Sequence, residues 1–156
     1  MRIRRASPTE ASVLSALALS AKQYWGYSPE DIERWRPLLG ISADDIATKP
    51  TFVAELENAV VGFYSLDPAA RTCELDHLWV SPHLARRGIG RALLAHAVNT
   101  ARFAGASSII IDADPNAEPF YVACGAVRRG IVAAPVVGDP ARVRPQLSLR
   151  VAPQPA

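Results

Sequence analysis

One stretch, residues 75–98, constrains the fold of this chain more than any other, because a strand turns into a helix there through a loop with two glycines. Apolar alternation ends at Val80, and a helical apolar face begins at Ile89. Gly88 and Gly90 let the backbone approach a ligand closely. Three basic residues accompany them: Arg86, Arg87 and Arg91. Because a helix start also offers unpaired N–H groups and partial positive charge, the stretch predicts a pyrophosphate site.

Two of the three phosphate-binding loops that this pattern suggests lack a required residue. A Walker A loop ends in Gly-Lys-Ser or Gly-Lys-Thr, whereas Gly90 is followed by Arg91 and Ala92. A dinucleotide-binding loop carries a third glycine and opens a doubly wound parallel sheet. Here the third glycine is absent and the preceding strands read as antiparallel hairpins. A coenzyme A loop is the third possibility, and an ordinary helix start with exposed arginines is the alternative to all three.

Apolar periodicity predicts helices before and after a run of strands. Two expected helices follow the start signals at Ser7 and Ser28. Three more are expected over 42–48, 89–103 and 117–124. The expected strands are 3–5, a hairpin over 51–64 that turns near Asn58, 72–80, 108–112, 127–133 and 146–151. This order predicts an α+β fold: a central, mostly antiparallel mixed sheet with helices on both faces, in three α/β/α layers. We expect a single domain over 1–152 and a frayed tail over 153–156.

Composition restricts the kind of protein. With 156 residues, 49% hydrophobic and 21% charged, the chain suits one globular domain. A net charge of +2 without a basic stripe argues against a nucleic-acid partner, and no apolar run approaches the ~20 residues of a membrane span. Cys73 and Cys124 lie far apart and outside any Cys-x-x-Cys pair, so we expect no metal site, no disulfide and a reducing cytoplasmic location.

The order Val-x-Pro, Arg-x-Gly-x-Gly, Ala-Leu-Leu over 80–94 resembles the acetyl-CoA-binding signature of the GNAT superfamily of N-acetyltransferases. The resemblance implies that backbone amides of the loop cradle the pyrophosphate of acetyl-CoA, and that the strand before it pairs with the pantetheine arm. The cofactor-binding residues that it implies are Leu78, Trp79, Val80, Arg86, Arg87, Gly88, Ile89, Gly90 and Arg91. One position departs: the signature usually has Gln or Arg where this chain has Ala85.

A second stretch, 114–126, is similar to a later motif of the same family. There an Asn precedes a short helix that carries Ala, Tyr and Gly at intervals of four, as Ala117, Tyr121 and Gly125 do here. The resemblance implies that Tyr121 gives a proton to the leaving CoA thiolate and lies at the cofactor. Asp114 occupies the family's Asn position, so either it or Asn116 is expected to contact the pantetheine arm. The alternative for Tyr121 is a core residue whose hydroxyl reaches the surface.

The acidic strand 72–80 supplies candidates for a general base. Alternation places Glu74 and Asp76 on one face and His77 on the other. Amine acetylation needs a neutral nucleophile, so a carboxylate must remove a proton directly or through water. Glu74 resembles the basic Glu of the histone-acetyltransferase branch of the superfamily, and Asp76 is the alternative. Both could instead lie on a solvated face or pair with an arginine, and the face of His77 indicates a structural role.

The loop between the first two helices carries three aromatic residues, Tyr24, Trp25 and Tyr27. In the superfamily this connection borders the acceptor site, so the resemblance implies that they shape it; the alternative is that they pack beneath the helix pair. The favoured function is acetyl transfer from acetyl-CoA to a primary amine of a small-molecule or amino-acid-like acceptor, by direct attack in a ternary complex. The competing hypothesis is a non-catalytic module of the same fold that binds CoA or a metabolite. The sequence leaves a homodimer open as an alternative to a monomer.

Overall fold

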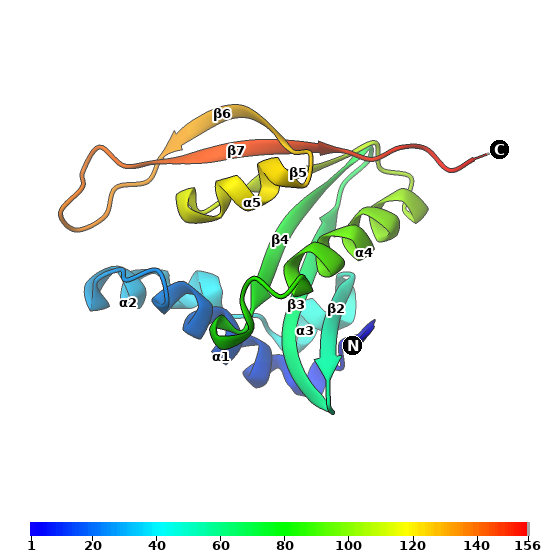
Figure 1. Ribbon diagram of the computed structural model, residues 1–156, viewed down its shortest axis with the longest axis horizontal. Coiled ribbons are helices and arrows are strands. Elements are labelled where there is room, and N and C mark those ends of the chain that lie inside the picture. Colours follow the sequence, from blue (N-terminus) through cyan, green and yellow to red (C-terminus); the bar gives the residue numbers. More distant parts are fainter. Residues whose placement is uncertain (156) are drawn as a thin grey trace. The chain divides into compact units, whose positions relative to one another are not determined.

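Seven strands form one mixed sheet in the order β1-β2-β3-β4-β5-β7-β6 in the computed structural model, which describes residues 1–155 (Figure 1). The strands are β1 (Arg2–Arg5), β2 (Thr51–Leu56), β3 (Ala59–Pro68), β4 (Thr72–Val80), β5 (Ser108–Asp112), β6 (Val127–Ala133) and β7 (Val143–Arg150). The α-helices are α1 (Ala11–Gln23), α2 (Pro29–Leu39), α3 (Ala43–Thr48), α4 (Ile89–Phe103) and α5 (Glu118–Ala123). Only β4 and β5 are a parallel pair among the pairings described, so the predicted α+β class with a mostly antiparallel sheet is confirmed.

The chain forms two compact units. The first contains Met1–Asp67 and Asp76–Ala97, and the second contains Pro68–Leu75 and the described chain from Val98 onward. Strand β4 and helix α4 each contribute to both units. The predicted single domain over 1–152 stays a prediction. Of the predicted tail, 153–155 have neither helix nor strand, and 156 lies outside the described residues.

In the first unit, helices cover both faces of strand β3. Phe63 belongs to a core cluster with residues of α1 and α3, among them Leu14 and Ile46. The neighbouring Gly62 points the other way, toward Ile89 and Leu93 of α4. Because successive side chains of a strand alternate between its faces, β3 carries α1 and α3 on one side and α4 on the other.

A two-residue turn joins β2 and β3, where the sequence predicts it. Leu56 pairs with Ala59, and the two residues between them, Glu57 and Asn58, have φ angles of 50° and 63°. Positive φ at both central positions is the type I′ geometry whose twist matches that of the flanking strands. Asn accepts this conformation more readily than most residues, so Asn58 is the sequence signal for the turn.

In the second unit, β6 and β7 form a hairpin, and β7 lies between β5 and β6 in the sheet. Strand β7 begins at Val143, three residues before the predicted start at 146, and the prediction of that boundary is therefore wrong. The cause is Pro145, which reads as a strand breaker but pairs with Ile131 of β6. Pro145 lies beyond the last residue pair between β7 and β5, which is Gln146 with Asp112. This end of β7 accepts a proline because no hydrogen bond to a strand on the β5 side needs the missing N–H.

No helix in the described part of the chain is both long enough and apolar enough to cross a membrane.

Replacing Gly62 with Ala tests the packing of α4 on β3. An added Cβ would lie 2.9 Å from the carbonyl oxygen of Trp79 and 3.0 Å from a methyl carbon of Leu93. We expect the free energy of unfolding to fall by about 1–3 kcal/mol, because overpacking a filled core forces backbone shifts. Urea denaturation measures this, with Gly130→Ala as the control, since its Cβ would meet only the side chain of Gln146 at 3.6 Å. Equal stability of the two variants would contradict the packing described.

Candidate functional site

The loop between β4 and α4 is fixed to β3 at its start. The backbone N–H of Ser81 donates to the carbonyl of Val61 at 2.8 Å, and a 3-10 turn, Pro82–Leu84, follows. Arg86 and Gly88 then adopt positive φ angles of 64° and 84°, and the helix begins at Ile89. A non-glycine residue in this region costs about 1 kcal/mol, so the surroundings of Arg86 must hold its conformation.

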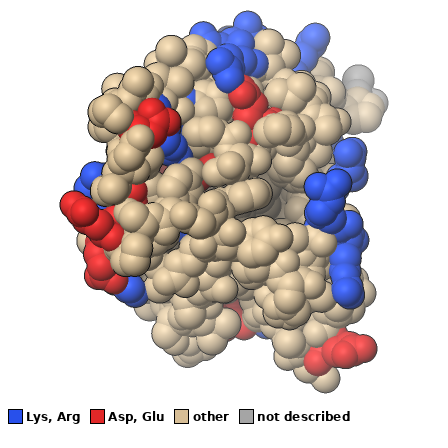
Figure 2. All heavy atoms as spheres, turned by 60° about the vertical axis from the view of Figure 1, so that its left-hand side comes forward, with Lys and Arg blue, Asp and Glu red and all other residues tan. Residues whose placement is uncertain are grey.

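The first turn of α4 presents its backbone N–H groups at this loop. The N–H of Ala92 donates to the carbonyl of Gly88 at 3.0 Å. The N–H groups of the helix residues before Ala92 have no acceptor carbonyl within the helix, because no helical turn precedes them. The three nearby arginines, Arg86, Arg87 and Arg91, are exposed. Such a combination of amides, helix dipole and full positive charges favours a phosphate group. Figure 2 shows that Lys and Arg side chains gather in groups on the face drawn.

The strand residues that precede the loop are partly buried. Leu78, Trp79 and Val80 all have intermediate exposure, and Trp79 packs against the core cluster that contains Phe63. The carbonyl of Trp79 lies against Gly62, so this end of β4 lies directly beside β3. The backbone of Leu78, Trp79 and Val80 is thereby held by packing on neighbouring elements of the first unit.

The two candidate bases lie in different surroundings. Asp76, in the first unit, accepts a hydrogen bond from the Lys49 ammonium at 3.0 Å, and the same ammonium lies 3.5 Å from Asp67. The hydrogen bond to Asp76 raises the pKa of Lys49. Glu74, in the second unit, is exposed on the segment of β4 that pairs in parallel with Ile110 of β5. Asp76 is therefore engaged by a cation of the chain itself, whereas Glu74 faces solvent.

His77 directly follows Asp76 in sequence but has a structural environment. Its ring packs on Phe63 at 5.6 Å between centroids, and its Nδ1 accepts the indole N–H of Trp79 at 3.1 Å. The neutral ring therefore carries its proton on Nε2. Burial lowers the pKa of His77, partly opposed by the negative charge of Asp76. This packing agrees with the structural role expected from its face of the strand.

The three aromatic residues after α1 differ in exposure. Tyr24 and Trp25 contact each other edge to face at 5.9 Å and are 63% and 42% exposed, so they do not fill the core beneath the helices. Tyr27 is partly buried and meets the ring of Trp35 at 4.8 Å and 90°. The ammonium of Lys22 lies 5.0 Å from the Tyr27 ring and 4.6 Å from the Trp35 ring, a double cation–π contact.

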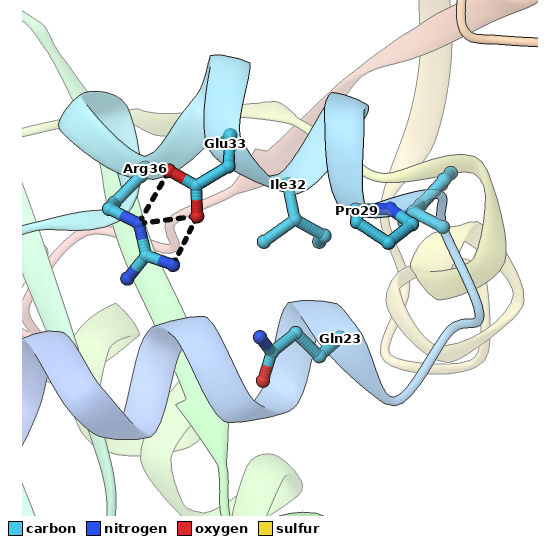
Figure 3. A pocket seen from close by; sticks show the side chains of 6 residues that line it. Gln23, Pro29, Ile32, Glu33 and Arg36 are labelled. Carbon is cyan, nitrogen blue, oxygen red and sulfur yellow. Dashed lines mark hydrogen bonds and ion pairs between the residues drawn. The ribbon is translucent and has the colours of Figure 1, made fainter.

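A pocket of about 170 Å³ opens beside this aromatic corner, between α1 and α2 (Figure 3). Its lining comprises Gln23, Tyr27, Pro29, Ile32, Glu33 and Arg36. Ile32 supplies a buried apolar surface, while the Arg36 guanidinium donates to both carboxylate oxygens of Glu33. The guanidinium lowers the pKa of Glu33. The pocket thus combines an apolar surface with one paired negative and positive charge.

Tyr121 and Asn116 belong to the second unit. Tyr121 is 7% exposed in α5, and burial, with smaller contributions from Cys124 and Asp114, raises its pKa above the ordinary value. Its phenol therefore keeps its proton at neutral pH. Asn116 lies in the turn before α5, where both its backbone N–H and its side-chain amide donate to Asp114. Asp114 thus acts as a capping residue for this turn.

Within the first unit, the end of β4 and the start of the loop that carries Arg86 and Arg87 both lie against β3, and Tyr27 lines a pocket. The sequence did not reveal the partner of Asp76, because Lys49 lies 27 positions away. It also missed Glu33 and Arg36, although their i, i+3 spacing on an expected helix is a usable signal for an ion pair. All the predicted site residues, including Glu74, Asn116 and Tyr121 of the second unit, remain predictions as site residues.

His77→Gln tests the buried neutral imidazole. Because the folded pKa is below the ordinary value of about 6.5, the unfolded chain binds a proton that the folded ring resists, and stability falls as pH drops below that value. We expect wild type to lose more unfolding free energy than His77→Gln between pH 7.5 and 5.5, with a limiting slope of about 1.4 kcal/mol per pH unit. Burial also lowers the pKa of His96, but that ring is present in both proteins.

Urea denaturation at the two pH values provides the measurement. His83→Gln is the control, because His83 is exposed and bonds only to Ser81 among the contacts described. Parallel pH dependence of wild type and His77→Gln would rule out the neutral buried state.

Comparison with known proteins agrees with this geometry. A model of the acetyltransferase (GNAT) family matches residues 15–126. A GCN5-related N-acetyltransferase from Rhodopseudomonas palustris has a TM-score of 0.76 at 25% identity, over 96% of this chain and 94% of that one. The PaiA N-acetyltransferase from Thermoplasma acidophilum, solved with coenzyme A, has a TM-score of 0.74 at 21% identity, over 96% and 98%.

The ribosomal-protein-S18-alanine N-acetyltransferase from Escherichia coli has a TM-score of 0.75 at 15% identity, over 99% of this chain and 96% of that one. Comparison with curated protein sequences gave no match. Because the family model matches most of the chain and full-length structures share the fold, the chain belongs to the GNAT acetyltransferase family.

Proposed function

We propose that the protein transfers an acetyl group from acetyl-CoA to a primary amine of a small-molecule or amino-acid-like acceptor. The observation that carries the proposal is the loop between β4 and α4. Arg86 and Gly88 turn the backbone there through positive φ, and the first N–H groups of α4 and three exposed arginines belong to this one segment. The pyrophosphate of coenzyme A has the charge and size for such a cradle.

Three features support the coenzyme over another phosphate ligand. The fold is that of a family of acetyltransferases, and the similar Thermoplasma structure was solved with coenzyme A. The loop binds through main-chain groups, so Ala85, where the family signature has Gln or Arg, removes a side chain but no amide. Trp79 and Val80 stand directly before the loop on a strand that is held by packing, where a pantetheine arm would lie along them.

The reaction needs three proton transfers around one attack. A base removes a proton from the acceptor ammonium, and the amine nitrogen attacks the thioester carbonyl. The nitrogen of the tetrahedral intermediate then loses its second proton to solvent as the C–S bond breaks. The thiolate takes a proton from the phenol of Tyr121, which is later restored from solvent. The raised pKa of Tyr121 keeps the donor protonated at neutral pH, although it also weakens the drive for proton transfer. No covalent acyl-enzyme is required.

Glu74 is the better candidate base of the two. Its carboxylate is exposed, whereas Asp76 already holds the ammonium of Lys49 at 3.0 Å and would have to give up that partner. We therefore assign the base to Glu74 and a structural role to Asp76.

The pocket beside α1 and α2 supports the proposed acceptor class. Its wall offers Ile32 for an apolar body and the Glu33–Arg36 pair for charged ends, and Tyr27 closes one side. A small molecule of the amino-acid type matches these groups, because its carboxylate complements the Arg36 guanidinium while its amine is left to react. Tyr24 and Trp25, exposed next to the pocket in the chain, are the residues we expect a bulkier acceptor to contact.

The alternative is a module of this fold that binds coenzyme A without turnover. The presence of Tyr121 at the spacing of the family's later motif and the acidic strand that carries Glu74 and Asp76 favour an enzyme over that alternative. Location in the cytoplasm, with acetyl-CoA as substrate and no metal, completes the proposal; Cys73 and Cys124 are both free thiols, as a reducing compartment requires.

Tyr121→Phe tests the proton donor. We expect turnover to fall by about 10²-fold, the usual contribution of a positioned general acid, with the KM for acetyl-CoA within about threefold of wild type. Release of free thiol from acetyl-CoA over a panel of amines and amino acids measures it. Tyr64→Phe is the matched control, because it also removes one buried hydroxyl, here the partner of His96 Nδ1 at 2.7 Å. An unchanged rate in Tyr121→Phe would remove this residue from the mechanism.

The same assay separates enzyme from binding module. Wild type that shows a thermal shift with coenzyme A but releases no thiol with any amine would favour the non-catalytic alternative.

Glu74→Gln and Asp76→Asn together test the base. We expect the glutamine variant to lose about 10²-fold in kcat/KM at pH 7 and to recover as pH rises, because solvent then deprotonates the acceptor amine. We expect Asp76→Asn to stay within about threefold and to lose some thermal stability with the Lys49 contact. Kinetics of both variants between pH 6.5 and pH 9.5 provide the measurement. The opposite ranking would move the base to Asp76.

A further inference from the structure

The ammonium of Lys22 occupies a corner that two aromatic rings form. Lys22 lies in the last turn of α1, and its Nζ lies 5.0 Å from the ring centroid of Tyr27 and 4.6 Å from that of Trp35. The two rings meet edge to face, with centroids 4.8 Å apart and planes at 90°. Aromatic rings grouped around one cation are the arrangement with which proteins bind the ammonium groups of ligands. The corner therefore has the form of a cation site, and its occupant is a side chain of the protein itself.

The two rings are also held by contacts that do not involve Lys22. On α2, the guanidinium of Arg34 lies 5.6 Å from the Trp35 ring and donates to the buried carboxylate of Asp31 at 2.7 Å. The edge-to-face contact with Trp35 in turn holds the ring of Tyr27. We therefore expect the corner to keep its form when the side chain of Lys22 is shortened.

The corner adjoins the pocket between α1 and α2. Tyr27 belongs to both, and Gln23, which lines the pocket, directly follows Lys22 in the chain (Figure 3). An acceptor in the pocket that carried a second ammonium would find the cation site at Tyr27 already filled. Exchange of one ammonium for another adds no contact, so such an acceptor gains nothing over one with a single amine.

We propose that Lys22 is a specificity-determining residue, which fills the cation site of Tyr27 and Trp35 and so denies it to acceptors that carry a second ammonium. The inference rests on the proposed acetyl transfer and on the acceptor role of the adjoining pocket. The ligand class of the opened site is an ammonium compound, either primary or quaternary. An acceptor with one amine and an otherwise neutral or anionic body does not use the site.

Lys22→Ala is the decisive variant, because alanine suits the helix and opens the corner. The chain has three tryptophans, so ¹⁵N-indole labelling gives three resonances, and that of Trp35 is assigned by its loss in Trp35→Phe. The probe is tetramethylammonium chloride, exchanged for sodium chloride at constant ionic strength. In Lys22→Ala it should shift the Trp35 resonance with an affinity about tenfold above wild type, the order of two cation–π contacts at a partly exposed site. The uncharged analogue tert-butanol should not show this gain.

Matched variants separate the opened space from other effects. Lys22→Arg keeps a cation in the corner and Lys22→Met keeps an uncharged chain that fills it, so neither should gain affinity. Arg2→Ala removes one positive charge from an exposed side chain of β1 and should behave as wild type. Lys22→Ala/Tyr27→Leu lacks one aromatic wall and should lose most of the gain. If Lys22→Ala does not fold, Lys22→Ser opens the same space and has the same expected result.

Turnover provides a second readout. Two pairs of acceptors differ only in a second ammonium: lysine with norleucine, and 1,5-diaminopentane with pentylamine. In Lys22→Ala the ratio of kcat/KM within a pair should rise about tenfold in favour of the diamine, through its KM, with the KM for acetyl-CoA within about threefold of wild type. A merely structural role of Lys22 would change both members of a pair together.

The result that would overturn the inference is a wild-type affinity for tetramethylammonium in Lys22→Ala, an equal gain in Lys22→Met or Arg2→Ala, or no gain for either diamine. If wild type releases no thiol with any amine, the proposed function fails, whereas the titration still decides whether Lys22 fills a cation site.

Discussion

The close contact between α4 and β3 at Gly62 is the constraint on which the first unit depends. Ile89 and Leu93 pack on this glycine from one side, and the carbonyl of Trp79 lies beside it. Since Ser81 also bonds to Val61, both ends of the loop between β4 and α4 are fixed on neighbouring residues of one strand. A loop held at both ends can keep Arg86 in a conformation that costs energy, and it can present the helix N–H groups without rearranging.

The chemistry that we propose depends on a second kind of constraint, which is electrostatic. In the second unit, burial is the main reason that Tyr121 keeps its proton, and the Arg142 guanidinium lies 3.7 Å from the Asp114 carboxylate. In the first unit, the ammonium of Lys49 donates a hydrogen bond to Asp76. In both cases a carboxylate pairs with a cation from a distant part of the chain.

The sequence predicted those features that depend on local patterns. The turn at Asn58 and the start of α4 at Ile89 follow from residue preferences and periodicity within a few positions. The predicted start of β7 was wrong, because the rule against proline in strands takes no account of where the neighbouring strand ends. The pairing of Asp114 with Arg142, or of Lys49 with Asp76, joins residues about 28 positions apart, and no local pattern encodes such contacts.

The edge strand β6 has a consequence for association between molecules. It ends the sheet order, so one side of its backbone is open to another strand, and a run such as Ile131 to Ala133 would favour such an addition. A register shift between Arg128 and Gly130 interrupts its regular hydrogen-bonding edge, and Arg128 and Arg129 are exposed there. Arg128 pairs with Glu118 of α5, whereas Arg129 adds a positive charge that an added strand would have to accommodate. The register shift and this charge are both features by which edge strands avoid pairing with another chain.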